Sequence, residues 1–439
     1  MKKTIPILIL TAVLIGAVTL VICPLPTGTA EYTYTIAQDG ATITGYYGTS
    51  AKIKIPSYLG GYPVVRIESL GGADKENHDG TAHAKLTSII LPNGIEFIGR
   101  AAFEGCERLT YVYIPASLIC VFETFDNCPK LKKIEVSPDN KRYFSDSQGI
   151  LYERGGQWTE WNKGNVYLTR CPPGKTGAIT VPKNVTTISP ASFGNCKNIT
   201  SIDILSKETH IAGGAFEGCE RLTSINIPAM ATDIRPYTFK DCTSLTSITL
   251  PDSVDRIGEA AFSGCTSLTS ITLPAKMKEI GESAFENCTA LKEITIPSGV
   301  KEISGKTFSG CTSLASIEIP EKITALRYEA FMNCTSLTAV TFKNKNTAIV
   351  EETSEKDVYE DTGHQTYYMG RFTYRPTFLG CENLTTVYGI PDGAVESFAE
   401  KQRVTFIPLN ELRKREFLYK LCAAVLLFEV VRYGNPLPV

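Results

Sequence analysis

The sequence is poor in the side chains that most enzymes use for acid–base and metal chemistry. It has only four histidines, and none stands at the spacing of a nucleophile–base pair or of an H-E-x-x-H zinc site. Its fourteen cysteines contain no C-x-x-C pair, which removes the commonest zinc pattern. We therefore expect no catalytic residues, no cofactor and no metal site, and we do not expect an enzyme.

An excess of positive charge is also missing. The 44 Lys and Arg residues face 46 Asp and Glu residues, for a formal net charge of -2. Because binding to nucleic acid depends on basic side chains that neutralise phosphates, we expect no nucleic-acid partner.

Long apolar runs are absent except near the N-terminus. Lys2 and Lys3 precede an apolar stretch over 5–23, and Gly28 and Ala30 supply the small residues of a cleavage site. This pattern predicts an export signal at 1–30, cut after Ala30, and hence a secreted or cell-surface protein. The length of the run leaves open an uncleaved membrane anchor, which would be the only contact with a membrane.

What the sequence does have is a repeat. Residues 243–265 read TSLTSITLPDSVDRIGEAAFSGC, residues 266–288 read TSLTSITLPAKMKEIGESAFENC, and the two match at 15 of 23 positions. A Phe-x-x-Cys signature recurs ten times, at Cys106, Cys128, Cys196, Cys219, Cys242, Cys265, Cys288, Cys311, Cys334 and Cys381. A short fixed period predicts a solenoid of stacked coils rather than a globule with one core.

Each coil begins with a strand pattern. Leu268, Ile271 and Leu273 alternate with polar residues, and Pro274 then ends the pairing because it has no N–H to donate. A second short extended piece follows up to Ile280, and the remaining residues to Cys288 allow one or two helical turns. We expect a parallel β-sheet on one face of the stack, with ladders of Phe and Cys inside it.

This pattern of a Leu/Ile strand, Pro, Ile-Gly and Ala-Phe-x-x-Cys resembles the BspA-like leucine-rich-repeat family over about residues 85–409. The resemblance implies a bacterial-type surface or secreted protein, of a family in which several members bind host proteins or other cells. The same position in each coil suits a small apolar side chain, so we expect the repeat cysteines to be free, buried thiols.

The interruptions of the repeat suggest a division of the chain. We expect an N-terminal cap with degenerate repeats at 31–84, the solenoid at 85–389, a C-terminal cap at 390–410 and a tail of unknown role at 411–439. The first insertion falls at 137–175 and has Trp158 and Trp161 at its tip. The second falls at 343–376, where an acidic segment is followed by an aromatic one. We expect this second insertion to be a solvated loop, with calcium binding or partner binding as alternatives.

The exposed positions of the first strand form the candidate binding face, since solenoids bind partners on concave sheets of this kind. Its residues are Tyr111, Tyr113, Ser224, Asn226, Ser247, Thr249, Ser270, Thr272, Glu293, Thr295 and Tyr388. Ser and Thr are also undemanding strand residues, so the tyrosines are the stronger candidates.

Two functions fit this reading. The first is an exported, non-enzymatic scaffold that binds a protein or a glycan at a cell surface, and the alternative is a structural spacer or surface-layer component with no specific ligand.

Overall fold

The structure is a computed structural model of the 439-residue chain. It describes residues 31–71, 83–100, 102–121, 124–125, 128–155, 164–350, 352–361, 366–375 and 377–410. These residues belong to two compact units: unit 1 comprises Met1–Glu160 with Pro172–Gly174, and unit 2 comprises Trp161–Cys171 with Lys175–Val439. The predicted export signal, both tryptophans, residues 72–82 of the predicted N-terminal cap and the 411–439 tail lie outside the described residues.

Unit 1 begins with an antiparallel hairpin and continues as parallel coils. The hairpin strands are β1 (Tyr32–Ala37) and β2 (Gly40–Tyr46), and β2 then pairs in parallel with β5 (Tyr62–Ile67), to which β4 (Tyr58–Leu59) adds antiparallel. The second extended segment of each following coil continues this sheet; these segments are β7 (Phe97–Ile98) and β9 (Cys120–Val121). The first strands form a separate parallel sheet of β3 (Lys52–Lys54), β6 (Ser88–Ile90), β8 (Tyr111–Ile114) and β10 (Lys133–Val136), while a short 3-10 helix spans His83–Lys85.

The insertion after β10 adds strands rather than an irregular loop. Strands β11 (Tyr143–Ser145) and β12 (Leu151–Arg154) pair antiparallel in unit 1. In unit 2, β13 (Val166–Arg170) pairs in parallel with β15 (Thr187–Ile188), so regular coils begin again from there.

In unit 2 the first strands form two separate sheets. One contains β14 (Thr176–Val181), β16 (Asn198–Ile204) and β18 (Ser224–Ile225); the other contains β23 (Ser316–Ile319), β25 (Ala339–Phe342), β29 (Thr386–Gly389) and β30 (Thr405–Pro408). Between them, the first-strand segments belong to no strand. They are joined by the isolated bridge Thr249↔Thr272 and by single main-chain hydrogen bonds such as Thr269 N–H to the Thr246 carbonyl. The expected parallel sheet is therefore interrupted in the middle of the most regular repeats.

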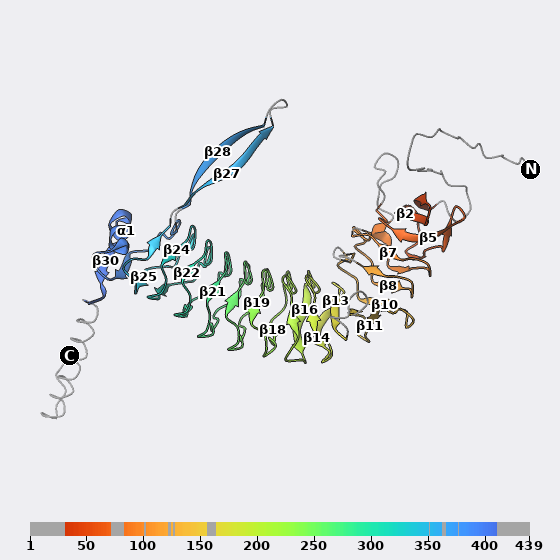
Figure 1. The fold of residues 1–439 in the computed structure, drawn as a ribbon, viewed down its shortest axis with the longest axis horizontal. Helices are drawn as coiled ribbons and strands as arrows, with labels where there is room; N and C mark the ends of the chain where they lie inside the picture. Colours follow the sequence, from red (N-terminus) through yellow and green to blue (C-terminus); the bar gives the residue numbers. More distant parts are fainter. Residues whose placement is uncertain are drawn as a thin grey trace, which may run out of the picture. The chain divides into compact units, whose positions relative to one another are not determined.

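The second extended pieces of unit 2 pair in parallel in three separate groups. They are β15, β17 (His210–Ile211), β19 (Asp233–Ile234), β20 (Arg256–Ile257), β21 (Glu279–Ile280), β22 (Glu302–Ile303), β24 (Ala325–Leu326) and β26 (Ala348–Ile349). Within unit 2 the coils stand farther apart along the edge with β14, β16 and β18 than along the edge with β21, β22 and β24 (Figure 1). The first-strand face is thus the convex side of this unit, and our expectation of a concave face was wrong here.

A ladder of stacked phenylalanine rings runs through unit 2, as the repeat predicted. Ring centroids of successive coils lie 5.3–5.7 Å apart from Phe193 to Phe378. Phe262 is fully buried between Phe239 and Phe285, which confirms the predicted inside of the coil. The ladder ends on Phe398 of helix α1 (Ala394–Gln402), 5.4 Å from Phe378.

The repeat cysteines form a second ladder beside the rings. In seven successive copies, from Cys219 to Cys381, the Sγ–H donates to the backbone carbonyl of the Phe in the preceding coil, at 3.0–3.3 Å. All twelve cysteines that the structure describes are free thiols, as predicted. Hydrogen-bonded turns rather than a helix connect the second strand to this cysteine, for example Ala284 N–H to the Gly281 carbonyl.

The insertion at 343–376 is not a plain loop, and that expectation was wrong. After β26 the chain forms a long antiparallel hairpin of β27 (Glu352–Asp361) and β28 (Thr366–Arg375), paired over ten residues each. Acidic residues are depleted in strands, which is why the β27 sequence suggested a loop.

Candidate functional site

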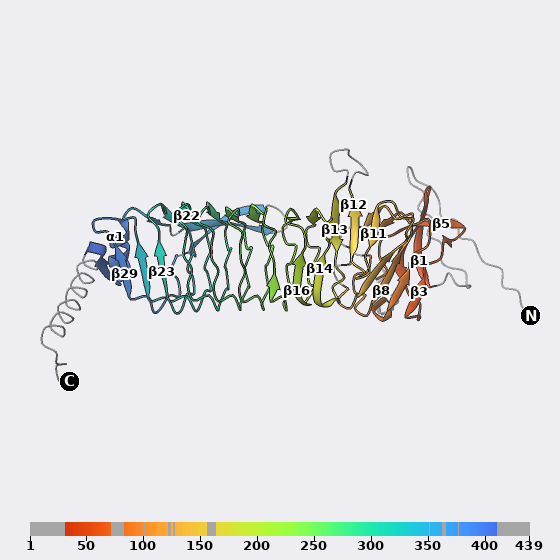
Figure 2. The ribbon, with the colours of Figure 1, turned by 90° about the horizontal axis from the view of Figure 1, so that it is seen from below.

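The candidate face divides between the two units. Tyr111 and Tyr113 lie in β8 of unit 1, and the other nine residues lie in unit 2. The eight Ser, Thr, Asn and Glu candidates are exposed, whereas the three tyrosines are half-buried. The repeat pattern therefore identified outward-facing positions correctly. Figure 2 shows unit 2 from the side of its first strands β14, β16, β23 and β29.

In unit 1 the tyrosines are part of a polar cluster. β8 lies between β6 and β10, so Tyr111 is paired with Lys133 and Tyr113 with Glu135. The Lys133 ammonium lies 5.9 Å from the centre of the Tyr111 ring and donates a hydrogen bond to the Glu135 carboxylate. Burial and the neighbouring Glu135 charge raise the pKa of Tyr111, and the Lys133 hydrogen bond lowers the pKa of Glu135. These groups hold one another in place.

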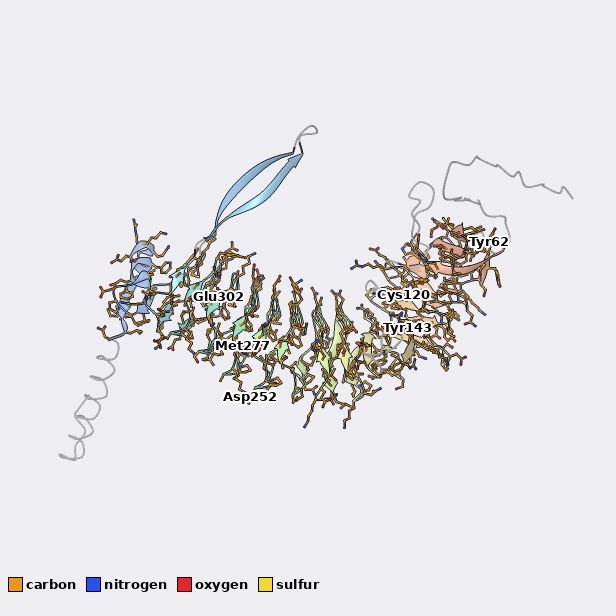
Figure 3. All side chains as sticks on the ribbon, viewed as in Figure 1. Tyr62, Cys120, Tyr143, Asp252, Met277 and Glu302 are labelled. Atoms are coloured by element: carbon orange, nitrogen blue, oxygen red, sulfur yellow. The ribbon has the colours of Figure 1, made fainter. Side chains whose placement is uncertain are left out.

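In unit 2 the structure brings four of the candidates together around one groove. The groove has a volume of about 520 Å³ and is lined by Ser224, Asn226, Ser247 and Thr249, together with Thr223, Ile225, Ile227, Ala229, Ile248 and Pro251. Asp252, which follows Pro251, lies on the outer side of this unit (Figure 3). Ser270, Thr272, Glu293 and Thr295 continue the exposed column away from the groove, and Tyr388 lies in β29 between β25 and β30.

The groove forms where strand pairing stops. β18 pairs with β16 through Ser224 and Ile225 and is the last strand of its sheet. The Asn226 amide extends the pairing backward: its Oδ1 accepts from Ile204 N–H at 2.7 Å and its Nδ2 donates to the Ile204 carbonyl at 2.9 Å. Asn226 therefore substitutes for main-chain bonds to the preceding coil, and its role is more structural than predicted.

Two apolar residues beside the groove were not predicted. Leu205 is 50% exposed and Met230 is 66% exposed, the highest value for a large apolar residue among those described. The sequence did carry a signal, because Leu205 replaces the proline found after the strand in most other coils. Met230 likewise occupies a position that holds Ser253 and Lys276 in the next two coils.

Within the described ranges, no group of three or more His, Cys, Asp or Glu side chains is placed to hold a metal ion. The helices in those ranges include none that is both long and apolar enough to span a membrane.

Comparison with known proteins identifies the repeat. The family model described as "BspA type Leucine rich repeat region" matches in six copies, over residues 81–148, 175–253 and 232–356, which is more than half of the chain. No curated protein sequence matches.

Matches among solved structures include bacterial leucine-rich-repeat proteins. A leucine rich cell surface protein from Faecalibacterium prausnitzii is 21% identical over 85% of this chain and 97% of its own, with a TM-score of 0.46. A leucine-rich repeat protein from Bacteroides ovatus is 21% identical over 88% of this chain and 100% of its own, also at 0.46. The pneumococcal vaccine antigen PcpA is 16% identical over 89% of this chain and 98% of its own, at 0.36. On the family match, the chain belongs to the BspA-type leucine-rich-repeat family.

Proposed function

We propose that this protein is an exported, non-enzymatic recognition scaffold that binds a protein or a glycan at a cell surface through its first-strand face. The observation that carries the proposal is the column of exposed side chains on this face of unit 2. All eight of its predicted Ser, Thr, Asn and Glu residues are exposed to solvent. A solenoid can present such a column over many coils, so that surface residues bind the partner while the core residues only stabilise the fold.

Export is proposed on the sequence of 1–30 alone. If the segment is a cleaved signal, N-terminal sequencing of the exported protein begins at Glu31. Recovery of a membrane-bound protein that still begins before Ile5 would instead establish the anchor.

The binding itself is tested with an array of purified extracellular proteins and an array of glycans. The probe is the full chain, alongside its Tyr111→Ala/Tyr113→Ala variant and a variant with Ser247→Arg. A recognition scaffold binds a reproducible subset of spots, and at least one of the two variants loses that binding while its urea midpoint stays unchanged. Absence of any reproducible binding would favour the alternative of a structural spacer.

A further inference from the structure

The last strand of unit 2 is apolar on both of its faces. β30 pairs in parallel with β29 and is the last strand of its sheet in the part of the chain that the structure describes. From Phe406 to Leu409 every residue is apolar, and every one is half-buried. A strand with one buried face alternates apolar and polar residues, whereas a continuous apolar run is typical of a strand that is covered on both faces.

The inner face of β30 has its cover. Phe406 is paired with Val387, which is fully buried, so this face continues the core side of the preceding coil. Phe406 and Val395 of helix α1 both lie against Gly389. Strand β30 and helix α1 lie together at the C-terminal end of unit 2 (Figure 1). The preceding coil and α1 therefore cover the inner face.

The outer face of β30 ends the column of outward-facing residues with an apolar side chain. Ile407 is paired with Tyr388, Tyr388 with Thr341, and Thr341 with Glu318. The three earlier members of this column carry a polar group, and Ile407 does not. Ile390, which directly follows β29, is 38% exposed as well. The column thus ends in an apolar surface that no described residue covers completely.

The chain that follows β30 can reach this surface. In residues 417–431, 13 of 15 side chains are apolar, and Lys420 and Glu429 are the only charged ones. The segment begins seven residues after Asn410, a reach of at most about 25 Å. It is shorter than the roughly 20 apolar residues that a helix needs to cross a bilayer.

We propose that segment 417–431 packs on the outer face of β30 and covers Ile407 and Ile390. The short connection keeps the segment near this face at an effective concentration of about millimolar, which favours it over a second copy of the chain. The exposed charges at the end of α1, on Glu400, Lys401 and Arg403, have both signs, so burial of apolar surface rather than charge stabilises the contact. This inference does not depend on the proposed function.

Hydrogen exchange on the full chain measures the contact directly. We expect the amides of 417–431 to exchange at least about tenfold more slowly than those of an unstructured chain. Light scattering should show that the protein is monomeric under the same conditions. The exchange rates should not depend on protein concentration, because the contact lies within one molecule.

Two variants remove the contact from opposite sides. Ile407→Glu places a charge on the outer face of β30, and Leu426→Asp/Leu427→Asp places charges in the segment without changing any residue of a coil. Each should abolish most of the protection of 417–431, and the second should also make the amides of β30 exchange faster.

Thr341→Glu is the matched control, because it makes the same kind of change in the same column, where the preceding coil holds Glu318. It should leave the protection of 417–431 within about twofold of the wild type. Urea midpoints of all three variants establish that the fold is retained.

Fast exchange of 417–431 in the wild type would overturn the inference. Protection that survives Ile407→Glu in a folded variant would do so too, since the segment then packs elsewhere. Protection that appears only in dimers at high concentration would assign this face to a second copy. Protection that appears only with vesicles of phosphatidylcholine and phosphatidylglycerol would assign the segment to a membrane surface. Either of these last two results also contradicts the inference, whatever the binding arrays show.

Discussion

The Asn287 side chain lies directly over Gly310 of the next coil, so that its Oδ1 occupies the space that a β-carbon on Gly310 would need. Both residues have positive φ, 58° for Asn287 and 73° for Gly310. The same relationship joins Asn195 to Gly218, where a β-carbon would lie 2.8 Å from the Asn Oδ1.

This contact repeats along unit 2 with a period of two coils. The residue before each repeat cysteine has positive φ and alternates in type: Asn195, Gly218, Asp241, Gly264, Asn287, Gly310, Asn333 and Gly380. An Asn or Asp tolerates the left-handed conformation and covers the following glycine, whose missing side chain leaves the room. Neighbouring coils are therefore not equivalent, although their cysteines are evenly spaced.

Gly310→Ala should lower the free energy of unfolding by about 1–3 kcal/mol, because the new β-carbon meets Asn287 and the left-handed backbone disfavours alanine. Urea denaturation measures the loss. The double variant Asn287→Gly/Gly310→Ala should recover part of it, since the contact is removed and only the backbone strain remains. Losses that simply add in the double variant would show that the two residues do not interact.

Phe262→Ala should cost about 3–5 kcal/mol, because it leaves a cavity against Phe239 and Phe285 in the middle of the ring ladder. Thr272→Ala removes an exposed side chain of a neighbouring coil and should stay within about 0.5 kcal/mol. Chemical denaturation compares the two, and hydrogen exchange should locate the loosened coils next to residue 262. Similar losses for both would mean that the exposed face is assigned wrongly.

The sequence predicted the inside of the coil well and the pairing between coils poorly. Phe262 and the cysteines repeat at one position of every coil, and buried ladders follow directly from that period. Ser224 to Ile227 and Ser247 to Leu250 have nearly the same sequence pattern as their neighbours, yet pairing stops between them. The distance between neighbouring coils on this face depends on the curvature of the stack. That curvature arises from small rotations between successive repeats, which the sequence of a single repeat does not reveal.

Chemical labelling should separate the thiols by burial. Cys120 and Cys381 are half-buried, and the other ten described cysteines are buried. In the native protein a thiol reagent should react quickly with Cys120 and Cys381 and slowly with the ten buried cysteines. Cys23 and Cys422 lie outside the described residues. Denaturation without reductant should make the ten buried thiols reactive as well. Mass spectrometry of labelled peptides would identify which cysteines have reacted. Repeat cysteines that remain unreactive after denaturation would indicate disulfides and contradict the thiol ladder.

The same thiols should make stability fall at alkaline pH. Burial raises the pKa of Cys265 and of Cys311 to about 12, from an ordinary value near 9. Between about pH 9 and about pH 12 the unfolded state has therefore lost protons that the folded state keeps, so the free energy of unfolding decreases as pH rises, by about 1.4 kcal/mol per pH unit for each such group. Below pH 9 both states are protonated and these groups contribute no slope.

Cys265→Ala isolates one thiol from the lysines and tyrosines that titrate in the same range. Its free energy of unfolding should fall less steeply with pH than that of the wild type above about pH 9, and the two slopes should coincide at neutral pH. The variant is also less stable at neutral pH, because Phe239 loses the hydrogen bond that its carbonyl accepts from the Cys265 Sγ–H at 3.2 Å. Urea titrations across this pH range measure both effects. Parallel slopes at all pH values would mean that Cys265 ionises equally in both states and is not buried as a thiol.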